Sequence, residues 1–164
     1  EGVSPAPERH GPDIVLAPGV GIVRAKLLAV PTIGFLNAHA GRLPKYRGNN
    51  PILWSLMYGD ALGVTVHLMD RGIDTGDLLQ FEEYLPCGHE SISALVRAME
   101  SFSVDQLTTV ISRLRAGEIQ PQPQGAGLYW PQFPARLWQE AEKRLALRQE
   151  DDGHLAEKVE SVDS

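Results

Sequence analysis

Two short apolar runs near the start of the sequence constrain the fold of this chain more than any other feature. The first is DIVLAP at 13–18, and the second is TIGFLNAHA at 32–40. Continuous apolar runs of this length, bounded by turn residues, are typical of strands buried on both faces of a parallel sheet. The segment IVRAKLLAV between them has the pattern of a short helix. A strand, a helix and a strand predict a βαβ unit with a right-handed crossover, and therefore an α/β fold.

Composition narrows the class of protein. The chain has 164 residues, 43% of them hydrophobic, so we expect one domain with a substantial core. Its net charge of -6 argues against nucleic acid as a partner. No apolar run is long enough to span a membrane, so no membrane association is expected. The single cysteine, Cys87, and the lack of a signal-like start favour a cytoplasmic protein.

Beyond these two runs, the pattern alternates between helical and extended segments. A helix is predicted from Pro51, with Asn50 as its N-cap and Gly59 at its end. Two further extended segments are expected to pair antiparallel, and two amphipathic helices follow them. These four segments are 62–70, 77–86, 91–116 and 135–149.

Three polar residues sit where an α/β fold places its chemistry. Asn37 and His39 lie two apart near the carboxyl end of the second strand, so they share one face. Asp74 lies in a polar turn between Gly72 and Gly76. Asn37 can donate to a carbonyl oxygen, and a protonated His39 can stabilise an oxyanion. Asp74, if close, would favour the charged form of His39 or accept a proton through water.

The same residues have a plainer interpretation as structural polar groups at a strand end. His67, on the segment 62–70, is interpreted as a hydrogen-bonded histidine that supports the Asp74 turn. GVGIVR at 19–24 lacks the third glycine of a dinucleotide fingerprint, so a tight turn is the better interpretation. The five histidines show no metal-ligand spacing, and we predict no metal. With no serine or cysteine nucleophile beside Asn37, His39 and Asp74, this set favours acyl transfer from a preformed donor to an amine.

Taken together, the motifs resemble the folate-dependent formyltransferase family, which includes methionyl-tRNA formyltransferase, sugar N-formyltransferases and glycinamide ribonucleotide transformylase. The ordered combination is highly specific and covers roughly residues 12–120. Its Arg-Gly pair is closer to the methionyl-tRNA and sugar branches than to the purine branch. The matching residues are Asn37 and His39, Leu43-Pro44, Arg47-Gly48, Gly63, Thr65 and His67, and Asp74 and Gly76.

The resemblance implies a Rossmann-like formyltransferase fold: a mixed, mostly parallel sheet flanked by helices, here with its N-terminal strands missing. It implies 10-formyltetrahydrofolate as formyl donor, with Asn37, His39 and Asp74 as the catalytic residues. It also implies that the folate pterin contacts two loops. The predicted folate-binding residues are Gly21, Ile22, Val23, Arg71, Gly72 and Ile73.

The expected acceptor is a primary amine, with an amino-sugar nucleotide slightly favoured. Arg42, Lys45 and Arg47 are predicted to bind a phosphate-bearing acceptor or the glutamate tail of folate, and a solvated loop is the alternative. Three aromatic residues are candidates to stack on a nucleotide base, although such residues more often pack: Tyr129, Trp130 and Phe133, of which Trp130 is the predicted binding residue. Other functions left open are hydrolysis of formyl-folate, formylation of methionyl-tRNA, and an inactive or partner-dependent module.

We divide the chain into three parts. Residues 1–120 are expected to form the C-terminal part of a formyltransferase catalytic core, and 121–149 an aromatic loop and a helix packed on it. The acidic tail, 150–164, is expected to be mobile. An exposed sheet edge where the first strands belong could promote a homodimer.

Overall fold

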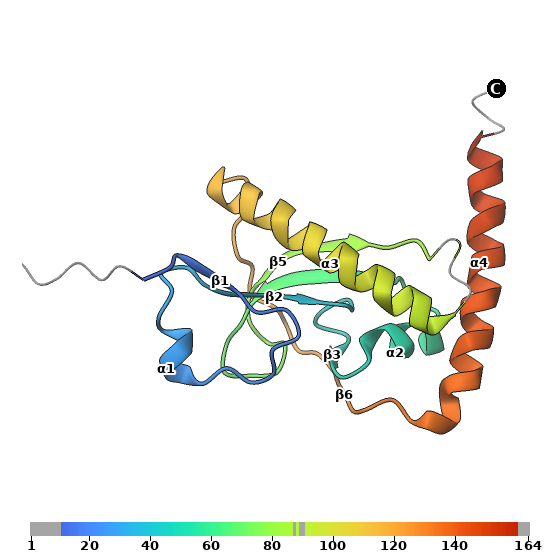
Figure 1. Cartoon of the computed structure of the whole chain (residues 1–164), viewed down its shortest axis with the longest axis horizontal. Helices are drawn as coiled ribbons and strands as arrows, with labels where there is room; N and C mark the ends of the chain where they lie inside the picture. The colour runs from blue at the N-terminus through green and yellow to red at the C-terminus, as the bar shows by residue number, and fades with distance from the viewer. Residues whose placement is uncertain (1–10, 87, 89–90, 161–164) are drawn as a thin grey trace, which may run out of the picture.

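The structure is a computed structural model that describes residues 11–86, 88 and 91–160, with residues 150–160 described by their backbone. Its centre is a four-stranded sheet in the order β1-β2-β4-β5, crossed on one side by the long helix α3 (Figure 1). Residues 1–10, 87, 89–90 and 161–164 lie outside the described residues, and Cys87 is among them.

The predicted βαβ unit is present. β1 (Ile14–Leu16) and β2 (Gly34–His39) pair in parallel, and α1 (Ala25–Leu28) lies between them in the sequence. The expectation that the first strand is buried on both faces is wrong, because Leu16 is 49% exposed. β1 is the outermost described strand, and α3 packs on β2 and β4 rather than over β1.

The rest of the sheet is antiparallel. β4 (Gly63–Leu68) pairs antiparallel with β2, and β5 (Leu78–Glu83) pairs antiparallel with β4, the second as predicted. The sheet is therefore mixed and flanked by helices, as expected, but within this four-stranded sheet only the β1–β2 pairing is parallel. The pattern of short apolar runs could not reveal this, because buried strands look alike in either direction.

The helix α2 (Pro51–Tyr58) begins and ends where the sequence predicts, and Gly59 closes it with a φ of 66°. The role assigned to Asn50 is wrong, because its side chain makes no capping hydrogen bond and its φ is 51°. Instead, Asn50 Oδ1 accepts a hydrogen bond from the backbone N–H of Phe133 at 2.9 Å. The side chain thus joins α2 to the C-terminal segment.

The helix α3 (Ile92–Arg115) packs on the sheet and forms the core with it. Its N-cap is Ser91, whose Oγ accepts a hydrogen bond from the backbone N–H of Ala94 at 3.2 Å. Its apolar stripe buries against the central strands, as the helical spacing predicts. Buried residues at this interface are Leu36, Val64, Val66, Ile92, Leu95, Met99, Leu107 and Val110.

The C-terminal segment returns to α2 and to the residues just before it. β6 (Tyr129–Trp130) pairs in parallel with β3 (Arg47–Gly48), and a short helical turn, η1 (Ala135–Leu137), leads into α4 (Trp138–Glu160). α4 packs against α2 and then extends past the end of α3 (Figure 1). It continues well beyond the predicted end at Gln149, because Leu, Ala, Glu and Lys in this stretch are good helix formers. None of the helices described over residues 11–160 is both long and apolar enough to cross a membrane.

Candidate active site

A cavity of about 400 Å³ lies where β2 runs past the end of β1. One wall is the carboxyl half of β2, and the loop after β1 and the turn after β4 form two others. Small and polar residues dominate its lining. The lining includes Gly19 to Val23, Asn37 to Ala40, Gly48, Asn49, His67, Met69, Asp70, Gly72 to Asp74 and Tyr129.

The three predicted catalytic side chains converge on this cavity. Nδ1 of His39 lies 3.5 Å from Oδ2 of Asp74. The other ring nitrogen, Nε2, lies 2.5 Å from the carbonyl oxygen of Tyr46, so it carries a hydrogen and donates. This contact fixes which nitrogen faces the carboxylate. When His39 is protonated, Tyr46 receives one of its N–H groups and Asp74 faces the other.

Asn37 and His67 face each other across antiparallel strands, since the β2–β4 register pairs them directly. Nδ2 of Asn37 lies 3.2 Å from Nε2 of His67, and Nδ1 of His67 lies 2.8 Å from the carbonyl oxygen of Leu68. Because a carbonyl only accepts, His67 Nδ1 carries the hydrogen. In the neutral ring, Nε2 is then an acceptor and must receive an N–H from Asn37.

Burial supports the neutral form of His67. The side chain is only 1% exposed, and this desolvation lowers the pKa of His67 below its ordinary value despite the nearby Leu68 carbonyl and Asp74. The neutral ring therefore sets the orientation of the Asn37 amide. One N–H of Asn37 goes to His67, and the second is available to a carbonyl oxygen in the cavity. Oδ1 of Asn37 is buried and has no hydrogen-bond partner among the described residues.

The interpretation that His67 supports the Asp74 turn is only secondary. His67 Nε2 lies 3.7 Å from Asp74 Oδ1, beyond hydrogen-bond distance, whereas its contact with Asn37 is direct.

Asp74 is held in an unusual backbone conformation. Its φ is 53°, in the left-handed region that non-glycine residues seldom adopt. Its Oδ2 accepts a hydrogen bond from the backbone N–H of Gly48 at 2.8 Å. Gly48 itself has a φ of 98°, and a Cβ there would lie 2.5 Å from the carbonyl oxygen of Trp130. Only glycine can therefore bring its backbone N–H to the Asp74 carboxylate in this place.

The predicted folate-binding residues mostly lie on the cavity. Five of them line it on opposite sides: Gly21, Ile22 and Val23 on the loop after β1, and Gly72 and Ile73 on the turn after β4. Arg71 is not part of the lining.

The predicted acceptor-binding residues do not line the cavity, and each has another partner. Lys45 Nζ lies 2.5 Å from Asp60 Oδ2, and the Arg42 guanidinium lies 4.6 Å from the centre of the Phe81 ring. The Arg47 guanidinium donates to Oε1 of Gln124 and not toward the cavity.

Trp130 is part of an aromatic cluster. Its ring centre lies 4.7 Å from that of Trp54, 5.1 Å from Tyr58 and 5.7 Å from Tyr46. Its indole N–H donates to the carbonyl oxygen of Lys45 at 2.8 Å. These contacts favour packing over stacking on a ligand.

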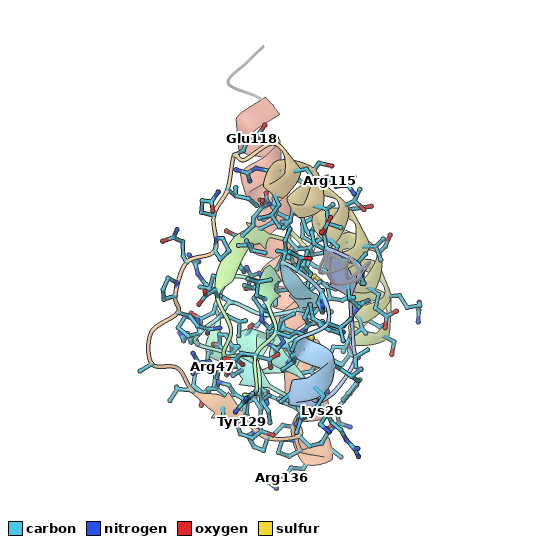
Figure 2. All side chains as sticks on the ribbon, turned by 90° about the vertical axis from the view of Figure 1, so that its left-hand side faces the viewer. Lys26, Arg47, Arg115, Glu118, Tyr129 and Arg136 are labelled. Carbon is cyan, nitrogen blue, oxygen red and sulfur yellow. The ribbon has the colours of Figure 1, made fainter. Side chains whose placement is uncertain are left out.

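Tyr129 lines the cavity, whereas its neighbour Trp130, the aromatic residue predicted to bind the acceptor, does not. The Tyr129 side chain is 56% exposed, and its hydroxyl accepts a hydrogen bond from Nδ2 of Asn49 at 3.3 Å. Figure 2 shows Tyr129 at the same end of the molecule as Arg47, as expected from the pairing of these two residues between β6 and β3. Alternation along β6 could have indicated it, because Tyr129 and Trp130 must point to opposite sides.

No group of three or more His, Cys, Asp or Glu side chains that could hold a metal ion occurs among the described residues. The polar side chains that line the cavity include an amide, an imidazole and a carboxylate, those of Asn37, His39 and Asp74. This set suits polarisation of a carbonyl group and management of a proton.

The mixed sheet and the polar cavity at the end of β2 together define a class of α/β domain, which comparison with known families identifies. The family model for formyl transferase matches residues 4–111, which is more than half of the chain. The chain therefore belongs to the formyl transferase family, and the prediction made from its motifs is confirmed.

Individual relatives agree. The methionyl-tRNA formyltransferase of Pelobacter propionicus is 37% identical over 119 residues, covering 71% of this chain and 37% of that protein. The methionyl-tRNA formyltransferase of Thermodesulfovibrio yellowstonii is 36% identical over 122 residues, covering 73% of this chain and 39% of that protein. This chain thus spans less than two fifths of the length of either relative.

Solved structures show the same fold. The formyltransferase PseJ from Anoxybacillus kamchatkensis, in complex with UDP-4,6-dideoxy-4-formamido-L-AltNAc and tetrahydrofolate, is similar with a TM-score of 0.64. The sequences are 22% identical, and the match covers 81% of this chain and 76% of that one. HypX from Aquifex aeolicus, in complex with tetrahydrofolic acid, gives a TM-score of 0.63 at 21% identity, covering 84% of this chain and 25% of that one. At these identities the likeness establishes the fold alone.

Proposed function

We propose that this protein transfers a formyl group from 10-formyltetrahydrofolate to a primary amine. The observation that carries the proposal is the meeting of Asn37, His39 and Asp74 at one cavity, with His39 Nδ1 3.5 Å from Asp74 Oδ2. The cavity volume of about 400 Å³ lies within the usual range for small-molecule sites. The relatives named as formyltransferases, and the tetrahydrofolate bound to PseJ and HypX, support this donor.

In the proposed reaction, the amine nitrogen attacks the formyl carbon and forms a new C–N bond. The carbonyl electron pair moves onto oxygen, where the free N–H of Asn37 donates to it. Both nitrogens of His39 already face protein oxygens, so His39 in its protonated form contributes positive charge beside the oxyanion. That charge is supported by Asp74 at 3.5 Å.

Collapse of the intermediate breaks the bond between the formyl carbon and N10 of the folate. A proton leaves the amine and a proton reaches N10, with Asp74 accepting and returning it through water. The products are a formamide and tetrahydrofolate. The polar backbone of Gly21 to Val23 and of Gly72 and Ile73 provides donors and acceptors for the pterin edge.

Two acceptor classes are proposed. An amino-sugar nucleotide is supported by the sugar nucleotide bound to PseJ. Methionyl-tRNA is supported by the higher sequence identity to relatives named methionyl-tRNA formyltransferase. The two acceptors share the primary amine on which the proposed chemistry depends.

The test is release of tetrahydrofolate from 10-formyltetrahydrofolate in the presence of each acceptor. Asn37→Ala and His39→Ala should each lower the rate strongly, because each removes stabilisation of the developing oxyanion, which is often worth about 10²- to 10³-fold. Formate release without any amine would indicate hydrolysis instead. Wild-type rates in both variants would refute the assignment of these two residues.

A further inference from the structure

Gln124 lies in the loop before β6, 50 residues after Asp74, yet it contacts the Asp74 turn directly. Its Nε2 donates to the carbonyl oxygen of Asp74 at 3.0 Å and to that of Gly76 at 2.5 Å. The side-chain amide of Gln124 thus donates both of its hydrogens to backbone carbonyls of this turn, one of them that of Asp74 itself. The Gln124 side chain is partly buried, whereas Gln122 in the same segment is exposed.

Arg47 fixes the direction of this amide. Its Nε and Nη2 donate to Oε1 of Gln124 at 3.2 and 2.7 Å, and Nη2 also donates to the carbonyl oxygen of Gly125 at 2.9 Å. Because a guanidinium only donates, it selects the oxygen end of Gln124 and turns the NH₂ end toward the Asp74 turn. Arg47 was predicted to bind a phosphate-bearing acceptor or the glutamate tail of folate, but its guanidinium is engaged by Gln124 and Gly125.

The backbone of Asp74 needs such support. Asp70 Oδ1 accepts from the backbone N–H of Gly72 at 2.9 Å and from the Thr75 hydroxyl at 2.6 Å, so the Asp70 side chain bridges the turn on both sides of Asp74 but bonds no atom of Asp74 itself. Asp74 has a φ of 53°, which carries a conformational cost of about 1 kcal/mol or more. Such a conformation persists only where surrounding contacts impose it.

The same strand supplies both supports of Asp74. In β3, the Gly48 N–H donates to the Asp74 carboxylate at 2.8 Å, while the neighbouring Arg47 holds Gln124 against the Asp74 carbonyl. The position of Asp74 therefore depends on β3 in two ways: Gly48 binds its side chain directly, and Arg47 holds its backbone through Gln124. A shift of the turn would move the carboxylate away from His39.

We propose that Gln124 is a positioning residue for Asp74, and that Arg47 acts in the reaction through Gln124 and not through the acceptor. This inference rests on the proposed function, in which Asp74 supports the charge of His39 and relays a proton. Gln124 touches neither the cavity nor His39, so its effect on catalysis passes through Asp74.

Gln124→Met keeps the length of the side chain but removes both donors and the acceptor. We expect kcat for formyl transfer to fall about 10- to 100-fold, the size of effect produced by a small misplacement of a reacting group. The matched control is Gln122→Met, which changes an exposed glutamine in the same segment and should leave kcat unchanged.

Gln124→Glu distinguishes two possible roles of Gln124. One is to hold the Asp74 turn through its N–H groups, and the other is only to accept hydrogen bonds from Arg47. The carboxylate keeps the contact with Arg47 but presents an oxygen to the Asp74 and Gly76 carbonyls, so kcat should fall at least as far as in Gln124→Met. Full activity of Gln124→Glu would overturn the proposal, because only the Arg47 contact would then matter.

A double-mutant cycle that combines Gln124→Met with Asp74→Asn tests whether Gln124 affects catalysis through Asp74. If Gln124 acts through Asp74, Gln124→Met should cause less than a twofold further loss of kcat in the Asp74→Asn background. Losses that multiply would overturn the inference and leave the proposed function intact. Unchanged activity of Asp74→Asn itself would instead refute the role proposed for Asp74.

Hydrogen exchange gives a readout that does not depend on activity. Backbone amides of residues 70–77 should exchange faster in Gln124→Met than in wild type, while Gln122→Met should match wild type. Equal exchange in all three proteins would overturn the inference even if no acceptor supports turnover.

Discussion

At the scale of single residues, the orientation of the Asn37 amide depends on His67. The Leu68 carbonyl fixes the hydrogen on Nδ1 of His67, which leaves Nε2 to accept from Asn37. In the motif Gly63-x-Thr65-x-His67, the histidine therefore accepts a hydrogen bond that orients the Asn37 amide. The predicted link between His67 and the Asp74 turn is present only as a contact of 3.7 Å, and the direct contact with Asn37 was not predicted because it is set by the strand register.

His67→Leu should lower kcat about tenfold or more, with a smaller change in KM for formyl-folate, because it frees the Asn37 amide to rotate. Steady-state kinetics with an amine acceptor would measure both constants. The effect should largely vanish in an Asn37→Ala background. Additive losses in the two variants would contradict a positioning role for His67.

Protonation of His67 should also link stability to pH. Since burial lowers its pKa in the folded state, the unfolded chain binds this proton more readily. Stability is fully present above the unfolded pKa of about 6.5 and falls as pH decreases from there toward the lower folded value. Thermal unfolding midpoints measured between these limits should therefore fall with decreasing pH. His67→Gln should show a weaker dependence, and an identical slope would contradict this assignment.

At the scale of elements, the short β3–β6 pair organises the site. It brings Gly48 to Asp74, Arg47 to Gln124, and Tyr129 to the cavity. Neither strand has more than two residues, so no periodic pattern in the sequence could identify them. The strands form because loops that are distant in the sequence pack together, with Gly48 permitting the close approach to Trp130.

Gly48→Ala should destabilise the protein and weaken the hold on Asp74. The φ of 98° and the 2.5 Å approach of a Cβ to the Trp130 carbonyl predict a loss of more than about 1 kcal/mol in unfolding free energy. Denaturant unfolding and kcat should both respond. Gly125→Ala is the matched control, because a Cβ there meets nothing within 4 Å. Equal stability of the two variants would contradict the steric account.

At the scale of the whole molecule, the C-terminal segment completes the candidate site. After α3 the chain returns past β5, and α4 then packs on α2 (Figure 1). Between them, Gln124 reaches the Asp74 turn, Tyr129 lines the cavity, and Trp130 and Phe133 pack on Trp54 of α2. Residues beyond 120 therefore contribute to the surroundings of the candidate site. The formyl transferase match at 4–111 ends before these contributions.

Trp130→Ala should test whether this tryptophan packs or binds a ligand. Loss of the contacts with Tyr46, Trp54 and Tyr58 predicts a decrease of about 3 kcal/mol in unfolding free energy. Trp130→Phe should retain most of that stability, because it keeps an aromatic ring in the cluster. Chemical denaturation of both variants measures this. A Trp130→Ala protein of wild-type stability with a raised KM for a nucleotide acceptor would instead support ligand stacking.

The sequence by itself determined the order and type of the main elements, the family, and the residues at the carboxyl end of β2. The elements follow from local periodicity and turn residues, and the family follows from the resemblance of the ordered motifs, all of which a linear sequence records. Asn37, His39 and Asp74 could be proposed together because the first two lie at the carboxyl end of β2 and the third lies in the glycine-flanked turn between β4 and β5.

Tertiary structure alone decided which side chains became partners. The antiparallel β2–β4 register placed His67 opposite Asn37, and chain closure brought Gln124 to the Asp74 turn. The same packing directed Arg42, Lys45 and Arg47 away from the cavity toward Phe81, Asp60 and Gln124. Contacts between distant segments depend on register and on competition among all available partners, and local sequence patterns contain neither.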